Sequence, residues 1–256
     1  MKKIYRNYYK NISSKYNKLR LDGEDEEINK TTEIISDYAS KEKGWILDAC
    51  CGTGRFCTKL DSMGFDVVAL DKSIHQLREV PEKFIKIQSS ITKTPFIENS
   101  FQAVLMVLCI QQLTQYERLK CFKELFRILN KDGYLFIKTC SHTDLKQRGF
   151  NCFFPSGLEL NLKRYPDIPD LEEELNKNML KIVQIVPTAT IQTINVDDLL
   201  NRVKSKHNTT LHLIPEKEFK DGCEKLCEFL GDSIEVEIPH RHTIVIAQKN
   251  IMNSKL

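Results

Sequence analysis

Five short apolar runs alternate with amphipathic stretches along the first 140 residues, and this alternation limits the possible folds more than any other feature. The runs are nearly continuous in Val, Ile and Leu, which is typical of strands buried on both faces. They occupy residues 45–50, 66–70, 84–88, 103–110 and 134–140. Helical periodicity between them predicts helices over 54–63, 73–79 and 115–129. Repeated strand–helix–strand units predict a parallel sheet with helices on both faces.

Two longer runs, 180–194 and 235–248, add strands to this sheet. We therefore expect an α/β fold with a Rossmann-like, mostly parallel seven-stranded sheet. The segment Asn130–Gly133 predicts a turn before the fifth run, in which Gly133 suits the left-handed residue that follows a helix.

The domain organisation follows from the same pattern. We predict a single domain over 1–256. It contains an N-terminal helical segment over 1–44, a cofactor-binding core over 45–140 and an accessory cap in the C-terminal half. The cap, which we expect to face the substrate, consists of two insertions, 141–179 and 195–233.

Composition excludes several classes of protein. The 38 Lys and Arg residues against 35 Asp and Glu leave a net charge of +3, which argues against a protein built to neutralise phosphates. The longest apolar stretch, 103–110, is far shorter than the ~20 residues of a membrane-spanning helix. The basic pair near the N-terminus precedes no apolar stretch, and the nine cysteines are an odd, scattered set. We expect a cytoplasmic protein with reduced thiols and no membrane partner.

The segment ILDACCGTGRFCTKL over 46–60 carries the strongest functional signal. A buried strand ends near Asp48 and passes through Gly52 and Gly54 into a helix. Two glycines at such a junction let a ligand approach the backbone, and the helix start offers unpaired N–H groups. The next strand ends in Asp71, nineteen positions after Gly52, where a carboxylate can accept hydrogen bonds from both ribose hydroxyls. This arrangement predicts a nucleoside site.

Two residues indicate which nucleoside this is. A dinucleotide-binding loop needs a third glycine, which would fall at position 57, and the sequence has Cys57 there. Asp48 would repel a pyrophosphate but suits a cationic or amine-bearing ligand. A nicotinamide-dependent oxidoreductase is therefore disfavoured.

From about residue 8 to residue 140 the chain resembles the class I S-adenosylmethionine-dependent methyltransferases of the small-molecule type. The segments LDACCGTGRF, VVALDKS, IQSSITKTPFIENSFQAVLMV and ELFRILNKDGYLFIKT are similar to successive motifs of that family, and YYKNISSKYNKL is similar to its N-terminal segment. The resemblance implies S-adenosylmethionine as cofactor and S-adenosylhomocysteine as product. It also implies a set of cofactor-binding positions: Tyr16, Asp48, Ala49, Cys50, Gly52, Gly54, Asp71, Lys72, Ser90, Ile91 and Leu108.

The chain departs from the family pattern at four positions. Cys50 replaces the first loop glycine, Ser90 an acid that meets the adenine amine, and Gln102 an acid at the start of the fourth strand. Gln112 stands where the family often has histidine, which removes a possible general base. The catalytic group therefore remains unassigned.

The acceptor side is less well defined by the sequence. We assign substrate contacts to Gln112, His142, Arg164 and Tyr165, since His142 follows the fifth strand and ligands lie at the carboxyl ends of parallel strands. Two pairs of potential zinc ligands also occur, His240 with His242 and Cys223 with Cys227. Neither has an obvious second pair, so we expect no metal.

Three functions stay open on the sequence. The first is methyl transfer to a small molecule or peptide by in-line displacement, which a cap would favour. The second is methylation of a nucleic acid such as tRNA or rRNA; the near-neutral charge makes this the weaker alternative. The third is a non-catalytic protein that binds S-adenosylmethionine and a partner. The oligomeric state is unknown.

Overall fold

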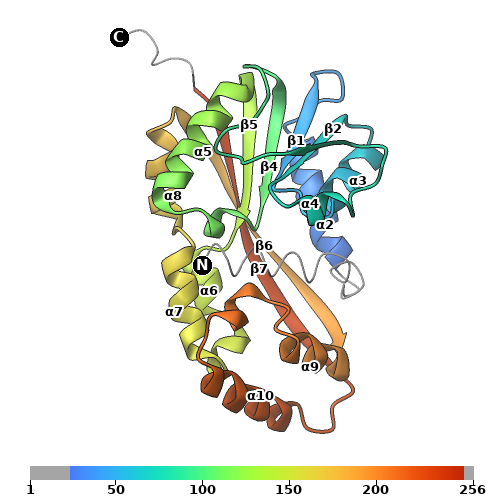
Figure 1. Ribbon diagram of the computed structural model, residues 1–256, viewed down its shortest axis with the longest axis vertical. Helices are drawn as coiled ribbons and strands as arrows, with labels where there is room; N and C mark the ends of the chain where they lie inside the picture. The colour runs from blue at the N-terminus through green and yellow to red at the C-terminus, as the bar shows by residue number, and fades with distance from the viewer. Residues whose placement is uncertain (1–23, 251–256) are drawn as a thin grey trace.

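The computed structural model describes residues 24–250, which form a seven-stranded sheet with the strand order β3-β2-β1-β4-β5-β7-β6 (Figure 1). Neighbouring strands from β3 to β5 run parallel, whereas β7 is antiparallel to both β5 and β6. The predicted α/β fold with a mostly parallel seven-stranded sheet is thus confirmed. The strands are β1 (Trp45–Ala49), β2 (Val67–Asp71), β3 (Ile85–Gln88), β4 (Phe101–Val107), β5 (Leu129–Thr139), β6 (Leu180–Asn195) and β7 (Glu235–Lys249).

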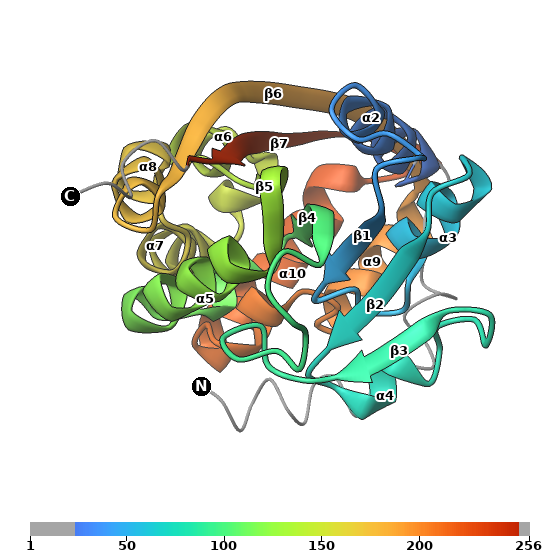
Figure 2. The ribbon, with the colours of Figure 1, turned by 90° about the horizontal axis from the view of Figure 1, so that it is seen from above.

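Helices cover both faces of the sheet (Figure 2). On one face, α5 (Gln115–Ile128) and α8 (Ile168–Asn176) pack against alternate residues of the central strands, such as Leu47, Val104 and Ile137. On the other face, α2 (Glu24–Ser36), α3 (Arg55–Ser62) and α4 (Ile74–Leu77) pack against the residues between them. Successive residues of these strands point to opposite faces and are apolar, so both faces of the sheet are apolar. A sheet covered by helices on both sides requires this.

The helix α8 is fixed to α5 by a buried ion pair. The guanidinium of Arg118 donates to both carboxylate oxygens of Glu174, from Nε over 2.7 Å and from Nη2 over 2.5 Å. A bidentate pair of this kind satisfies the charges of both groups inside the protein. The residues of α8 therefore belong to the layer over the sheet, and only the earlier part of the predicted 141–179 insertion joins the cap.

The long hairpin of β6 and β7 extends beyond the sheet and carries the cap (Figure 1). The strand β5 pairs with β7 only over 243–248, whereas β6 and β7 remain paired out to Asn195 and Glu235. The cap comprises α6 (His142–Lys146), η2 (Gly149–Cys152) and α7 (Pro155–Arg164) from the first insertion. The second insertion supplies α9 (Val196–Lys204), η3 (Thr209–His212) and α10 (Glu216–Leu230).

The two insertions share an apolar core of their own. Phe154 packs with Leu199, Phe219 and further residues of α9 and α10. Gly222 allows α10 to approach this ring, because a Cβ at that position would lie 2.5 Å from Phe154 Cε1. The cap is thus a packed unit at the end of the hairpin.

Two sequence expectations need correction or explanation. Residues 130–133 belong to β5, and Gly133 is absent from the described residues with a positive φ, so the predicted left-handed turn is wrong. Gln102, where the sequence resemblance implied an acid, is buried and holds the segment before β1 through its side-chain amide. Its Nε2 donates to the carbonyls of Ser40 (2.8 Å) and Gly44, and its Oε1 accepts from Ser40 N (2.9 Å). A carboxylate could not make the two donations.

Among the helices of residues 24–250, none combines the length and apolar character needed to cross a membrane.

Candidate active site

A cleft of about 1350 Å³ lies where β1, β2 and β4 end, between the sheet and the cap. Parallel strands of an open sheet bind ligands at this edge. The cleft is lined by residues from the loops after β1, β2, β3 and β4, and also by α2, the end of α9 and β7. Segments far apart in the chain therefore meet around one space.

The loop after β1 owes its shape to three left-handed residues. Gly52 has φ 57° and Gly54 has φ 78°, a region that suits glycine, and Cys50 adopts φ 63° despite its side chain. A glycine at the position of Cys50 would adopt this conformation without strain. Cys50 and Gly52 line the cleft.

Gly54 has a packing role instead. It precedes α3, and a Cβ there would lie 3.0 Å from Val80 Cγ1, so glycine is needed for close contact with the segment after α4. Neither Gly54 nor the fully buried Ala49 is among the residues that line the cleft.

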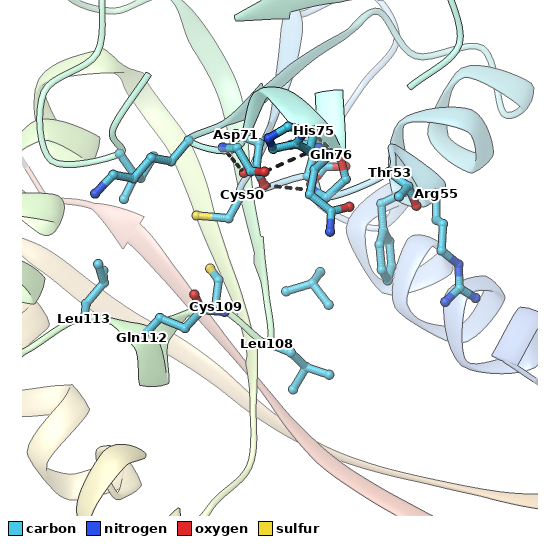
Figure 3. Close-up of a pocket in the computed structure, with 18 of the residues that line it drawn as sticks. Cys50, Thr53, Arg55, Asp71, His75, Gln76, Leu108, Cys109, Gln112 and Leu113 are labelled. Carbon is cyan, nitrogen blue, oxygen red and sulfur yellow. Dashed lines mark hydrogen bonds between the residues drawn. The ribbon is translucent and has the colours of Figure 1, made fainter. Parts of the chain in front are cut away.

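Asp71 connects this loop to the end of β2 (Figure 3). Its Oδ2 accepts a hydrogen bond from Gly52 N over 3.0 Å, and its Oδ1 accepts one from Ser73 N over 2.8 Å. Burial raises the pKa of Asp71, and the hydrogen bonds from Ser73 and Gly52 oppose that effect. A carboxylate offers about four acceptor positions, so sites remain for ligand hydroxyls.

Asp48 lies beneath the same loop with 1% of its surface exposed. Its pKa is raised to about 7, mainly by burial. The Cys57 thiol, which donates to Oδ2 over 3.2 Å, acts to lower the pKa, and the charge of Asp71 acts to raise it. Two buried carboxyl groups near one another repel when both are ionised. A cationic ligand group would relieve that repulsion.

Further predicted residues surround the same space. Lys72, Ser90 and Ile91 line the cleft on the side of β2 and β3, and Leu108 and Gln112 line it after β4. Leu108 has φ 46°, a strained conformation for a branched side chain. Tyr16 lies outside the described residues.

Three predicted substrate contacts are not brought to the cleft. The Nε2 of His142 lies 3.0 Å from the carbonyl of Tyr165, and its backbone N donates to Asp167 Oδ1 over 3.0 Å. Arg164 donates to Thr210 Oγ1 over 3.3 Å. His142, Arg164 and Tyr165 are all absent from the lining of the cleft and instead join α6, α7 and the cap to one another. His142 directly follows the fifth strand, but it does not reach the cleft because the chain continues there into α6.

A buried network on the cleft floor was missed from the sequence. Lys138 of β5 is fully buried. Its Nζ lies 2.7 Å from Oε1 of Glu27 in α2 and donates a hydrogen bond to Thr31 Oγ1 over 2.8 Å. The Nδ1 of His242 in β7 lies 3.3 Å from the same Glu27 oxygen. Burial lowers the pKa of His242 to about 4, with Glu27 acting in the opposite direction. His242 is therefore a neutral imidazole beside a carboxylate, and its burial disfavours protonation.

Basic side chains face the cleft from the cap and β7. Arg202 and His207 come from the end of α9 and the turn after it, and His240 lies two residues before His242 on the same face of β7. The rings of His240 and His242 stack with centroids 6.5 Å apart. Within residues 24–250, no group of three or more His, Cys, Asp or Glu side chains could hold a metal ion.

Two thiols approach one another in the cleft. Figure 3 shows the side chains of Cys50 and Cys109 directed toward each other. The hydrogen bond with Cys109 and burial raise the pKa of the Cys50 thiol well above its usual value. Cys50 is thus a neutral group, unsuited to act as a nucleophile.

Comparisons with known proteins agree with this geometry. A family model described as a methyltransferase domain matches residues 47–137. The chain is 31% identical over 140 residues to an uncharacterized protein of Methanocaldococcus jannaschii, a match that covers 54% of this chain and 60% of that protein. It is 32% identical over 104 residues to YqeM of Bacillus subtilis, provisionally described as a methyltransferase, covering 37% of this chain and 41% of YqeM. The match thus spans less than two thirds of either relative.

A solved structure extends the likeness beyond the matched segment. The fold resembles that of a protein from Anabaena variabilis, provisionally assigned as a methyltransferase of an antibiotic biosynthesis pathway. The TM-score is 0.63 at 19% identity, with 89% of this chain and 98% of that chain covered. The strand order, the loop after β1 and the match of residues 47–137 to the family model thus agree in their similarity to methyltransferases.

Proposed function

We propose that the protein transfers a methyl group from S-adenosylmethionine to a small-molecule acceptor enclosed between the sheet and the cap. The observation that carries this proposal is the position of Asp71. Its carboxylate is fixed to the loop after β1 by the hydrogen bond from Gly52 and lines a cleft large enough for two ligands.

The residues of the cleft fit the cofactor chemically. S-adenosylmethionine carries two positive groups, a sulfonium and an ammonium, and two carboxyl groups, Asp48 of β1 and Asp71 of β2, line the cleft. Gln76 is 3% exposed, and its Oε1 is a buried acceptor without a hydrogen bond in the described structure, 3.8 Å from where a Cβ of residue 52 would lie. A buried acceptor of this kind is stabilised by a ligand donor. Asp71 would hold the ribose, and Ser90 and Ile91 would border the adenine.

The reaction makes modest chemical demands on the protein. When bound, the cofactor supplies an activated methyl group on a positively charged sulfur. The loop after β1 and the residues after β4 would hold the two reactants in line, and the cap would exclude water; orientation of this kind supplies several kcal/mol.

A small acceptor is favoured because the cleft lies between the sheet and the cap. Cap residues such as Arg202 and His207 line the side opposite the sheet, so the acceptor would be enclosed. The net charge of +3 gives little electrostatic attraction for a nucleic acid.

The proposal is tested by supplying methyl-labelled S-adenosylmethionine together with separate small-molecule, RNA and protein fractions of a cell extract. We expect labelled product only from the small-molecule fraction, and its loss in Asp71→Ala. Transfer to the RNA fraction alone would replace this function with nucleic-acid methylation. Cofactor binding without transfer to any fraction would favour the non-catalytic alternative.

A further inference from the structure

We propose that Gln76 is a second ribose-binding residue, whose side-chain amide bonds one hydroxyl of the cofactor's ribose while Asp71 bonds the other. This inference rests on the proposed function and deepens it, because it adds a residue that determines which nucleosides the site accepts. It is carried by a polar group that the folded chain buries without a hydrogen bond.

The side chain of Gln76 lies inside the protein at the edge of the cleft. It belongs to α4 and is 3% exposed, yet it is one of the residues that line the cleft. Its Oε1 is buried and accepts no hydrogen bond within residues 24–250. Leaving a buried amide oxygen without a donor costs stability, so each such group in a folded protein calls for an explanation. Gln76 therefore marks a position where a hydrogen bond remains to be made.

A short series of hydrogen bonds connects Gln76 to Asp71. The backbone N of Ser73 donates to Asp71 Oδ1 over 2.8 Å, and the hydroxyl of Ser73 accepts from the backbone N of Gln76 over 3.4 Å. Both side chains also adjoin Gly52. Its backbone N donates to Asp71 Oδ2 over 3.0 Å, and Gln76 Oε1 lies 3.8 Å from where its Cβ would be. Figure 3 shows Gln76 on the side of Asp71, away from Gln112. The carboxylate and the amide thus border the same part of the cleft.

A ribose hydroxyl matches this amide better than the other polar groups of the cofactor's amino acid end. An amide carries an acceptor oxygen and a donor N–H group, and rotation about the last side-chain bond exchanges their positions. A hydroxyl both donates and accepts, so it satisfies either orientation of the amide. An ammonium can only donate, and a carboxylate can only accept. Because Asp71 would hold the ribose and Gln76 adjoins Asp71, the second hydroxyl is the group that fits.

Replacing Gln76 with an apolar residue of similar length separates ligand binding from a structural role. In the ligand-free protein, Gln76→Met removes a buried polar group that has no partner, so the urea midpoint of unfolding should lie at or above that of the wild-type protein. Gln76→Leu is measured in parallel, in case methionine does not fit the space. Gln115→Met is the matched control, because Gln115 is an exposed residue of α5 outside the cleft lining.

Titration calorimetry then measures the affinity of the folded variants for S-adenosylhomocysteine. We expect Gln76→Met to bind it about fivefold more weakly or worse, since a buried hydrogen bond is lost, and Gln115→Met to bind within about twofold of the wild-type protein.

The same comparison with adenosine, 2′-deoxyadenosine and 3′-deoxyadenosine locates the contact. In the wild-type protein, removal of either hydroxyl should weaken binding. In Gln76→Met, removal of one of the two hydroxyls should have no further effect, because its partner is already absent. Non-additivity of this kind is expected only for groups that interact.

The proposal is overturned if both deoxynucleosides lose as much affinity in Gln76→Met as in the wild-type protein. It is also overturned if Gln76→Met weakens S-adenosylhomocysteine but not adenosine, since the amide would then contact the amino acid part. A lower urea midpoint in both Gln76→Met and Gln76→Leu, but not in Gln115→Met, would overturn it as well, because the amide would then be structural. Failure of the wild-type protein to bind S-adenosylhomocysteine contradicts the proposed function, whereas binding that Gln76→Met leaves unchanged contradicts only the role of Gln76.

Discussion

The backbone N–H of Gly52 donates to Oδ2 of Asp71 over 3.0 Å, so that the loop after β1 and the end of β2 are joined without any ligand. This bond couples the two segments that surround a nucleoside in the proposed site. Because the acceptor is a carboxylate with remaining acceptor positions, the same group can hold the loop and bind ribose hydroxyls. The site is therefore organised before binding, which lowers the entropic cost of complex formation.

The pKa of Asp48 predicts how cofactor affinity depends on pH. Asp48 is largely protonated below its pKa of about 7 and ionised above it, and only the ionised form attracts a cation. Binding of S-adenosylhomocysteine, which carries an ammonium, should therefore strengthen from pH 6 to pH 8, by up to about tenfold per pH unit below the pKa. Titration calorimetry at pH 6, 7 and 8 measures this slope.

Two controls isolate the contribution of Asp48. Asp48→Asn should bind with the same affinity at all three pH values. Methylthioadenosine, which lacks the amino acid part, should show little of the pH dependence in the wild-type protein. A slope that persists in Asp48→Asn would show that another group titrates.

The strained backbone at Cys50 predicts that glycine is more stable there. At φ 63° a Cβ is unfavourable. The free energy of unfolding should therefore be about 1 kcal/mol higher for Cys50→Gly than for Cys50→Ala. Denaturation with urea measures the difference. The neighbouring Cys51, which is not among the residues with positive φ, provides the control: there glycine should be less stable than alanine. Equal stabilities of the two Cys50 variants would contradict the strain.

The pair of Lys138 and Glu27 predicts a large loss of stability when one charge is removed. Lys138→Met leaves Glu27 without its cationic partner beside a buried strand, and unfolding free energy should fall by about 3 kcal/mol or more. The exposed pair of Lys177 and Glu173 is the control, since Lys177→Met should cost less than about 1 kcal/mol. Addition of Glu27→Gln to Lys138→Met should recover part of the loss; a double variant less stable than Lys138→Met alone would argue against the pairing.

The sheet could be predicted from the sequence because its signal is local. Strands buried on both faces need continuous apolar residues, and the runs that end at Ala49, Asp71 and Val107 carry that signal directly. The two residues that define the nucleoside side, Gly52 and Asp71, are likewise marked by their place at strand ends. Their side of the cleft therefore follows from topology alone.

The acceptor side could not be predicted in this way. Glu27, Arg202 and His240 meet only because a long hairpin returns the cap over the strand ends, and such contacts leave no periodic trace in the sequence. One signal was available: Lys138 is a charged residue that directly follows the apolar residues 135–137 of β5, which implies a buried partner. His142 shows the opposite case, since its position in the chain was suggestive but α6 carries it to Tyr165.

The most direct test of the account is the affinity of Asp71→Ala for S-adenosylmethionine, measured by titration calorimetry beside Asp66→Ala. Asp66 is an exposed acid next to β2, so its replacement controls for the loss of one negative charge. The account predicts that Asp71→Ala weakens binding by about 1–3 kcal/mol, the loss expected for a charged acceptor, while Asp66→Ala binds within twofold of the wild-type protein. Wild-type affinity in Asp71→Ala would contradict the account.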